Sequence, residues 1–187
     1  MIAVYIIIGV VAVLIIILWA TYNGLVRLRN QVKNAWAQID VQLKRRHDLI
    51  PNLVETVRGY MRHERETLEA VTNARNLAQK AVGGGVGAQS KAEGELSGAL
   101  SRLLVVVENY PDLKANQNFL ALQEELTSTE NKISFSRQFY NDSVLKYNNK
   151  TQMFPSNVIA GMTGFRASEF FEVEVAAEKE APKVGFS

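Results

Sequence analysis

The chain opens with a long segment of apolar residues. From Ile2 to Leu18 it contains no charged residue and no proline. At about 1.5 Å per residue, the stretch up to Ala20 spans roughly 30 Å, which is the thickness of the hydrocarbon core of a bilayer. A cleaved signal peptide has basic residues before the apolar segment and a small-residue cleavage site after it, and this sequence has neither. The pattern therefore predicts an uncleaved transmembrane helix over residues 1–21.

Six residues spread along this predicted anchor are expected to face lipid or a neighbouring helix. They are Ile2, Ile8, Gly9, Ala12, Leu18 and Trp19. Small side chains such as Gly9 and Ala12 let transmembrane helices approach closely. Their spacing of three residues differs from the spacing of four in the attested dimer motif, so the pair is only a weak indication of self-association. Ordinary contact with lipid is the alternative interpretation.

The helical pattern continues beyond the anchor. Residues at spacings of three and four, all apolar except Gln42, form one face of a helix. These positions are Leu25, Leu28, Val32, Ala35, Ile39 and Gln42. No proline interrupts the stretch up to His47, and the basic residues Lys44 to His47 suit a helix C-terminus. We therefore expect one helix to run from the membrane to about His47, and Asp48 to cap a second helix with Pro51 in its first turn.

Three breaks divide the rest of the chain into helices. The second helix is expected to end at the glycine cluster Gly83–Gly87. Ser90 and Glu93 have the spacing of a capping box, which predicts the start of a third helix, and Pro111 ends it. A fourth helix from Asn118 to Met153 carries a heptad-like seam, typical of a helix packed against other helices. The seam consists of Leu122, Leu126, Thr129, Ile133, Ser136, Tyr140, Val144 and Tyr147.

Short elements follow the fourth helix. Ser156–Met162 is expected to form a helical turn stopped by Gly164, and Phe170–Val175 alternates apolar and charged residues as a short strand does. The predicted fold is all-α, with an N-terminal transmembrane helix continuous with a long antiparallel four-helix bundle and a short extended C-terminal tail. The predicted divisions are residues 1–21 for the anchor, 22–165 for the bundle and 166–187 for the C-terminal segment.

The composition argues against most kinds of active site. The net charge is only +2, which does not indicate nucleic-acid binding, and the absence of cysteine excludes disulfides and thiolate chemistry. His63 and Glu64 begin like a zinc-protease motif, but Thr67 stands where a second histidine is required. The glycine cluster lacks the residue order of a phosphate loop. The sequence thus predicts no catalytic residue, no metal ligand and no cofactor.

Several polar and aromatic residues lie in or beside the helical seams. They are Asn34, Trp36, Asp40, Asn131, Arg137, Tyr140, Asn141 and Asn148. Buried polar groups must pair, and a satisfied network fixes which helices meet and in what register. A structural network between helices is therefore the favoured interpretation of these residues. A binding groove for a small ligand or peptide, formed around Trp36, Arg137 and Tyr140, is the alternative.

Four stretches of the sequence resemble the LemA family. They are NAWAQIDVQLKRRHDLIPNLVETV (Asn34–Val57), PDLKANQNFLALQEELTSTENKI (Pro111–Ile133), YNDSVLKYN (Tyr140–Asn148) and FPSNVIAG (Phe154–Gly161). The resemblance extends in order from about Tyr22 to the C-terminus. It implies a bacterial membrane protein with an N-terminal transmembrane segment and a helical cytoplasmic bundle. It brings no catalytic residues, and it suggests a role in membrane organisation or scaffolding.

The distribution of basic residues predicts the orientation in the membrane. Arg27, Arg29 and Lys33 follow the apolar segment, and no basic side chain precedes it. The positive-inside rule places the C-terminal bundle in the cytoplasm and Met1 outside, with the three basic side chains at the lipid headgroups. We expect a single-pass protein of the bacterial cytoplasmic membrane.

Two functional hypotheses follow from these features. The first is a non-enzymatic scaffold that contacts lipid and forms a homo-oligomer larger than a dimer on the cytoplasmic membrane. Such a scaffold would organise or remodel the membrane or hold a partner protein. Its candidate partners are lipid, further copies of the chain and other membrane proteins, and no nucleic acid. The second is a membrane-tethered sensor or ligand-binding bundle, which would be a monomer or dimer with a polar-lined pocket. The absence of a recognisable catalytic motif favours the first hypothesis.

Overall fold

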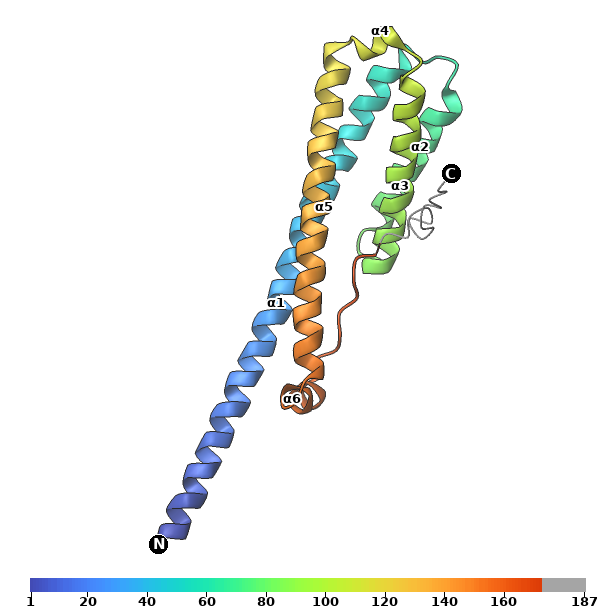
Figure 1. The fold of residues 1–187 in the computed structure, drawn as a ribbon. Coiled ribbons are helices and arrows are strands. Elements are labelled where there is room, and N and C mark those ends of the chain that lie inside the picture. The colour runs from blue at the N-terminus through green and yellow to red at the C-terminus, as the bar shows by residue number, and fades with distance from the viewer. Residues whose placement is uncertain (173–187) are drawn as a thin grey trace, which may run out of the picture. The chain divides into compact units, whose positions relative to one another are not determined.

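The computed structural model describes residues 1–172, which form helices joined by turns and, after the last helix, a non-helical segment at residues 165–172 (Figure 1). The helices are α1 (Ile2–Arg58), α2 (Arg65–Ala81), α3 (Val86–Val107), α4 (Pro111–Lys114), α5 (Gln117–Gln152) and α6 (Ser156–Thr163). Within residues 1–172 no segment forms a strand. The predicted all-α fold with one long N-terminal apolar helix is therefore confirmed.

The first helix is longer than the sequence indicated. It continues through the basic residues and Pro51 to Arg58, so the predicted end near His47 and the predicted cap at Asp48 are wrong. Proline has no backbone N–H, and Pro51 therefore leaves the carbonyl oxygen of His47 without its helical donor. The side chain of Arg75 from α2 donates from Nε to that oxygen at 2.8 Å. A contact between helices thus compensates the backbone hydrogen bond that Pro51 removes.

The start of the third helix also differs from the prediction. It begins at Val86, with Gly85 before it at a φ of 98°. Gly83 likewise has a positive φ, of 82°, so the glycine cluster supplies the turn between α2 and α3 as expected. The predicted capping box at Ser90 is wrong, because Ser90 and Glu93 lie inside α3 and both are buried.

The chain divides into two compact units, and the boundary crosses α1 and α5. The first unit contains Met1–Asp40 and Ser134–Phe170, and the second contains Val41–Ile133 together with Phe171 and Glu172. The domain boundaries predicted from the sequence at residues 21/22 and 165/166 stay predictions.

The first unit is built around the middle of α1 and the second half of α5. Their buried faces carry the residues that the helical spacing predicted, including Leu25, Val32 and Ala35 on α1 and Val144 and Tyr147 on α5. The short helix α6 follows and ends at Gly164, whose φ of 75° is left-handed. This confirms the expected helical turn and its stop.

The second unit has the larger hydrophobic core. One cluster joins the end of α1, the facing sides of α2 and α3, the short α4 and the start of α5. Its most enclosed members include Leu53, Val57, Met61, Val71, Leu96, Leu103, Leu113 and Phe119. Asn116 caps α5, because its Oδ1 accepts hydrogen bonds from the backbone N–H groups of Asn118 and Phe119 at 2.9 and 3.1 Å.

One predicted element is absent from the part of the C-terminal segment that the structure describes. Phe170–Glu172, the first half of the predicted strand, is not a strand. Phe171 is buried, and the carbonyl oxygen of Glu172 accepts a hydrogen bond from the Ser90 hydroxyl on α3, a side chain rather than a neighbouring strand. Residues 173–175 of this prediction, and the tail after them, lie outside the described residues.

Candidate functional site

The second unit contains a buried charge cluster formed by Arg46 and His47 of α1 and Glu93 of α3. These side chains expose only 2%, 5% and 2% of their surface. An Arg46 guanidinium nitrogen contacts the Glu93 carboxylate, and Nε2 of His47 lies 2.8 Å from the other carboxylate oxygen. The carboxylate therefore faces two basic side chains from adjacent positions of one helix.

Neighbouring polar groups complete the surroundings of Arg46. Its Nη1 donates to Oε2 of Glu130 at 2.6 Å and to Oγ of Ser97 at 2.8 Å. Its Nη2 also lies 3.4 Å from the backbone carbonyl oxygen of Glu93. Arg46 thus joins residues of α1, α3 and α5 within the second unit. A cavity of about 240 Å³ adjoins this arrangement and is lined in part by Arg46, Ser97, Glu130 and Asn131.

The surroundings of Glu93 favour its ionised form. Burial by itself raises the pKa of a carboxyl group, since it removes the charged form from water. The adjacent His47 side chain and the positive charge of Arg46 more than offset burial, so the pKa of Glu93 lies below its ordinary value of 4.5. The carboxylate is therefore charged at neutral pH and pairs with Arg46.

This arrangement suits a structural role better than a chemical one. A buried ion pair is costly to break, because removal of one member leaves the other charged in a low-dielectric interior. The cluster therefore ties the positions of α1 and α3 to one another. Within the described residues no group of three or more His, Cys, Asp or Glu side chains is placed to hold a metal ion.

The buried charge cluster was not predicted from the sequence. The sequence pattern predicts a charged helix end at Lys44–His47 and a helix cap that includes Glu93. The signal that identifies the cluster is its spacing: Arg46 lies three residues after Leu43 and four before Ile50, and both of these are buried. Arg46 therefore occupies the apolar face of a helix that continues, a position that requires a buried partner.

The polar residues named from the sequence fall into different surroundings. Trp36 and Tyr140 lie together in the first unit, with ring centroids 5.2 Å apart in an edge-to-face arrangement. Asn34 is exposed, and Asn131 is exposed in the second unit beside the 240 Å³ cavity. Three further residues of the first unit are partly buried: Asp40, Arg137 and Asn141. The structure therefore brings Trp36 and Tyr140 together, and it places Asn131 in a different unit from them.

Two of the polar residues predicted in or beside the seams, Tyr140 and Asn148, hold the segment that follows α6. The hydroxyl of Tyr140 donates to the carbonyl oxygen of Glu169 at 2.9 Å. Asn148 makes two hydrogen bonds with the backbone of Ser168, from Nδ2 to the carbonyl oxygen at 2.9 Å and from the Ser168 N–H to Oδ1 at 2.8 Å. Burial, followed by the nearby charge of Glu169, raises the pKa of Tyr140 to about 12. The phenol therefore stays protonated and remains a hydrogen-bond donor.

The residues of the predicted anchor lie on the exposed surface of α1. Ile2, Ile8, Gly9, Ala12, Leu18 and Trp19 are all exposed. By length and composition, the N-terminal part of α1 is apolar enough to cross a membrane, and none of that window is buried against the rest of the protein. Arg27, Arg29 and Lys33 are exposed beyond it, and the Arg29 guanidinium carbon lies 4.8 Å from the centroid of the Phe165 ring.

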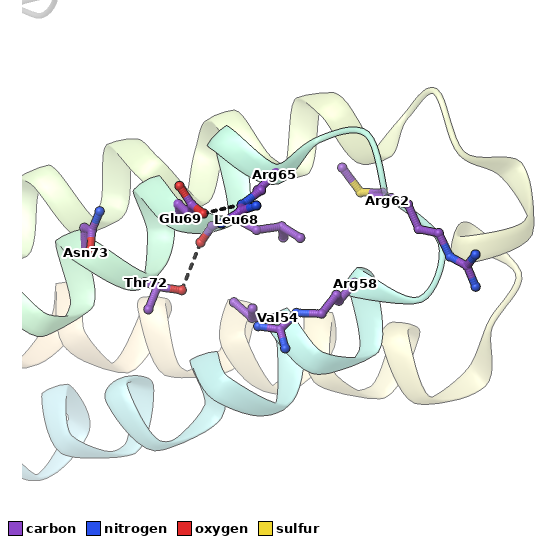
Figure 2. Close-up of a pocket in the computed structure, with 9 residues that line it drawn as sticks. Val54, Arg58, Arg62, Arg65, Leu68, Glu69, Thr72 and Asn73 are labelled. Atoms are coloured by element: carbon purple, nitrogen blue, oxygen red, sulfur yellow. Dashed lines mark hydrogen bonds and ion pairs between the residues drawn. The ribbon is translucent and has the colours of Figure 1, made fainter.

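A larger pocket lies at the end of α1 and the start of α2 (Figure 2). Its volume is about 490 Å³, and it is lined by Val54, Arg58, Met61, Arg62, Arg65, Leu68, Glu69, Thr72 and Asn73. Arg65 is paired with Glu69 at 2.6 Å, and Arg58 lies 3.6 Å from Glu55. Thr72 donates to the carbonyl oxygen of Leu68, as Figure 2 shows. His63 lies in the turn between α1 and α2 and is exposed.

These observations define a membrane-associated helical protein. Its apolar N-terminal helix continues into the folded helical region that contains the buried charge cluster. Residues 35–186 match the LemA family, and the chain belongs to that family. The resemblance found in the sequence is therefore confirmed.

Three relatives illustrate the range of similar proteins. Protein LemA of Metamycoplasma hominis is 30% identical over 161 residues, which cover 82% of this chain and 72% of the relative. Magnetosome protein MamQ 2 of Paramagnetospirillum magneticum is 25% identical over 181 residues, and magnetosome protein MamQ of Magnetospirillum gryphiswaldense is 24% identical over the same length. Each of these two alignments covers 84% of this chain, which spans only 66% of the length of either magnetosome protein.

Proposed function

We propose that this protein is a non-enzymatic scaffold that is anchored in the cytoplasmic membrane by one helix. In this proposal the copies assemble side by side into a homo-oligomer larger than a dimer, contact lipid, and organise the membrane or hold a partner membrane protein. The helical part lies in the cytoplasm and Met1 lies outside.

The observation that carries the proposal is the unbroken course of α1. The same helix contains the exposed apolar segment and, further along, Leu25 and Val32 in the core of the first unit. A continuous helix has no hinge between the membrane and that core, so every anchored copy presents the first unit to its neighbours in a similar orientation. Confinement to one surface also raises the effective concentration, and weak lateral contacts then suffice for assembly.

An exposed pair of phenylalanines on α5 supports lateral contact. Phe135 exposes 72% of its surface and Phe139 exposes 44%, and they lie one helical turn apart in the first unit. Burial of a large apolar side chain contributes about 1.5–3 kcal/mol, so the pair supplies a substantial part of a contact between copies. Contiguous exposed apolar groups of this kind are typical of interaction sites.

The distribution of charge supports the proposed orientation. Arg27, Arg29 and Lys33 follow the apolar segment of α1 and are exposed, as side chains in contact with anionic headgroups would be. The positive-inside rule then favours the cytoplasm for the helical part.

A ligand-binding bundle is the second candidate, and the 490 Å³ pocket is the observation that favours it. Its volume is within the range of small-molecule sites, and Arg58, Arg62 and Arg65 line it. Such a pocket suits a small anion. Arg65 is already paired with Glu69, and its fully exposed surroundings screen its charge. The scaffold is therefore the function that we favour.

Substitution of the phenylalanine pair tests the scaffold. Full-length protein carrying both Phe135→Ser and Phe139→Ser should shift from oligomer to smaller species in mass photometry in a mild detergent. The matched control is Val105→Ser, which removes an apolar side chain that is 70% exposed on α3 of the second unit. An unchanged mass distribution in the double variant would exclude this pair from the interface, and a wild-type monomer would refute the scaffold itself.

A further inference from the structure

The first unit carries a second exposed apolar surface, which the scaffold proposal does not use. It consists of Met153 and Phe154 in the turn after α5 and Val158 and Met162 on α6, and we call it the α6 apolar surface. Phe154 and Met162 each expose 82% of their surface, and Val158 exposes 53%. The other face of α6 is buried through Ile159 and Ala160. This short helix is therefore apolar on both its inner and its outer face.

Aromatic contacts place this surface beside the point where the apolar segment of α1 ends. The backbone N–H of Phe165 donates to the carbonyl oxygen of Ala160, which joins Phe165 to α6. The Phe165 ring packs edge-to-face on Tyr22, with centroids 5.8 Å apart, and lies under the guanidinium of Arg29. Tryptophan and tyrosine are enriched where a transmembrane helix passes the headgroups, so Trp19 and Tyr22 mark that level on α1.

The direction of α6 suits a position in the plane of the membrane. Figure 1 shows α6 nearly end-on, across the end of α5, where α5 runs alongside α1 in the first unit. If α1 crosses the bilayer, α6 lies roughly parallel to the bilayer surface at the level of Tyr22. Helices that bind membranes without crossing them lie in this plane.

The charges around α6 are complementary to an anionic lipid surface. From Asn149 to Ala167 the chain contains no Asp or Glu, and it contains Lys150 and Arg166. Arg27 and Lys33 add exposed positive charge on α1 in the same unit. Basic side chains next to exposed apolar ones form the combination by which interfacial helices bind anionic bilayers.

We propose that α6 and the turn before it form a second membrane contact, in which the α6 apolar surface inserts into the headgroup and acyl boundary of the leaflet where α1 emerges. Met162, Val158 and Phe154 enter the apolar edge of that leaflet, while Lys150 and Arg166 remain at the phosphates. The contact fixes the first unit against the bilayer, and it requires no second copy of the chain.

Depth measurement by lipid quenching tests this contact. The chain has no cysteine, so Met162→Cys and Val158→Cys each give one site for an environment-sensitive fluorophore. Full-length protein is placed at one copy per nanodisc containing phosphatidylcholine and phosphatidylglycerol, with a quencher on the acyl chains. We expect blue-shifted emission and a depth of roughly 5–10 Å below the headgroups at both positions.

The matched control is Phe135→Cys with the same fluorophore. Phe135 is 72% exposed on α5 of the same unit, and it lies 18 residues before Met153, roughly 27 Å along the helix. We expect the fluorophore at this position to show the emission typical of contact with water and little quenching by the acyl-chain quencher. Equal quenching at positions 135, 158 and 162, or water-like emission at 158 and 162, would overturn the proposal.

Two further experiments distinguish contact with lipid from contact with a second copy of the chain. Met162→Asp, an exposed substitution, should reduce the quenching of the fluorophore at position 158, whereas Phe135→Asp should leave it unchanged. A blue shift that appears only when a nanodisc holds several copies would overturn the lipid contact and assign the surface to self-association. Because the main measurement uses single copies, its result does not depend on whether the scaffold proposal is correct.

Discussion

Glu93→Gln tests whether the buried charge cluster holds the second unit together. The substitution keeps the size of the side chain and removes the negative charge that faces Arg46 and His47. Removal of one member of a buried ion pair lowers the free energy of unfolding by about 3–5 kcal/mol. Glu130 still accepts a hydrogen bond from Arg46 at 2.6 Å, so we expect the lower end of that range, about 3 kcal/mol.

Hydrogen exchange of the full-length protein in detergent measures this loss locally. The slowest amides of α3 report the opening of the second unit, and about 3 kcal/mol corresponds to roughly 150-fold faster exchange, since 1.4 kcal/mol is a factor of ten. Glu125→Gln is the control. It removes the same charge from an exposed pair with Arg45, in which the side chains expose 49% and 46% of their surface, and such pairs contribute about 0–1 kcal/mol.

The dependence of this effect on pH provides a second check. The pKa of Glu93 is lower in the folded protein than its ordinary value of 4.5, so folding favours the ionised form. Its contribution is therefore complete above pH 4.5 and is lost as the pH falls through the lower folded value. Protection of α3 should fall with acid in the wild type and less steeply in Glu93→Gln. If Glu93→Gln exchanges no faster than Glu125→Gln, the cluster does not stabilise the unit and our reasoning is refuted.

Three other predictions concern the core, a hydrogen bond and the topology. Ile133→Ala should cost roughly 2–5 kcal/mol, because Ile133 is only 2% exposed, and a change within about 0.5 kcal/mol in urea denaturation would contradict its burial. Tyr140→Phe removes the hydrogen bond to Glu169 and should lower the free energy of unfolding by about 1 kcal/mol. Amides near Ser168 should then exchange faster, and unchanged exchange there would refute the role of that bond. A cysteine placed near Ser187 should resist a membrane-impermeant reagent in intact cells or spheroplasts, and efficient labelling would reverse the proposed orientation.

The elements that the sequence predicted well are those with strong local periodicity. The apolar segment of α1, the buried face that includes Leu25 and Val32, and the seam of α5 all depend on residues three or four positions apart. Such patterns require no knowledge of distant parts of the chain. Gly164 likewise stops α6 through its own left-handed conformation.

The predictions that failed depend on contacts between residues far apart in sequence. Pro51 normally indicates a helix end or first turn, but Arg75, 24 residues later, donates to the freed His47 oxygen and the helix continues. Ser90 and Glu93 have the spacing of a cap, but Arg46 and His47 require the Glu93 carboxylate as a buried partner. The local spacing of Ser90 and Glu93 does not distinguish a helix cap from a buried ion pair, because the partner Arg46 lies 47 residues away in the sequence.

Self-association of the wild-type chain remains the central claim, and its mass in a membrane tests it most directly. Full-length protein should be reconstituted into nanodiscs large enough for many copies, and into several mild detergents, and then measured by mass photometry. We predict a homo-oligomer larger than a dimer under these conditions. A monodisperse monomer in every detergent and in the large nanodiscs would contradict the scaffold and favour the ligand-binding bundle.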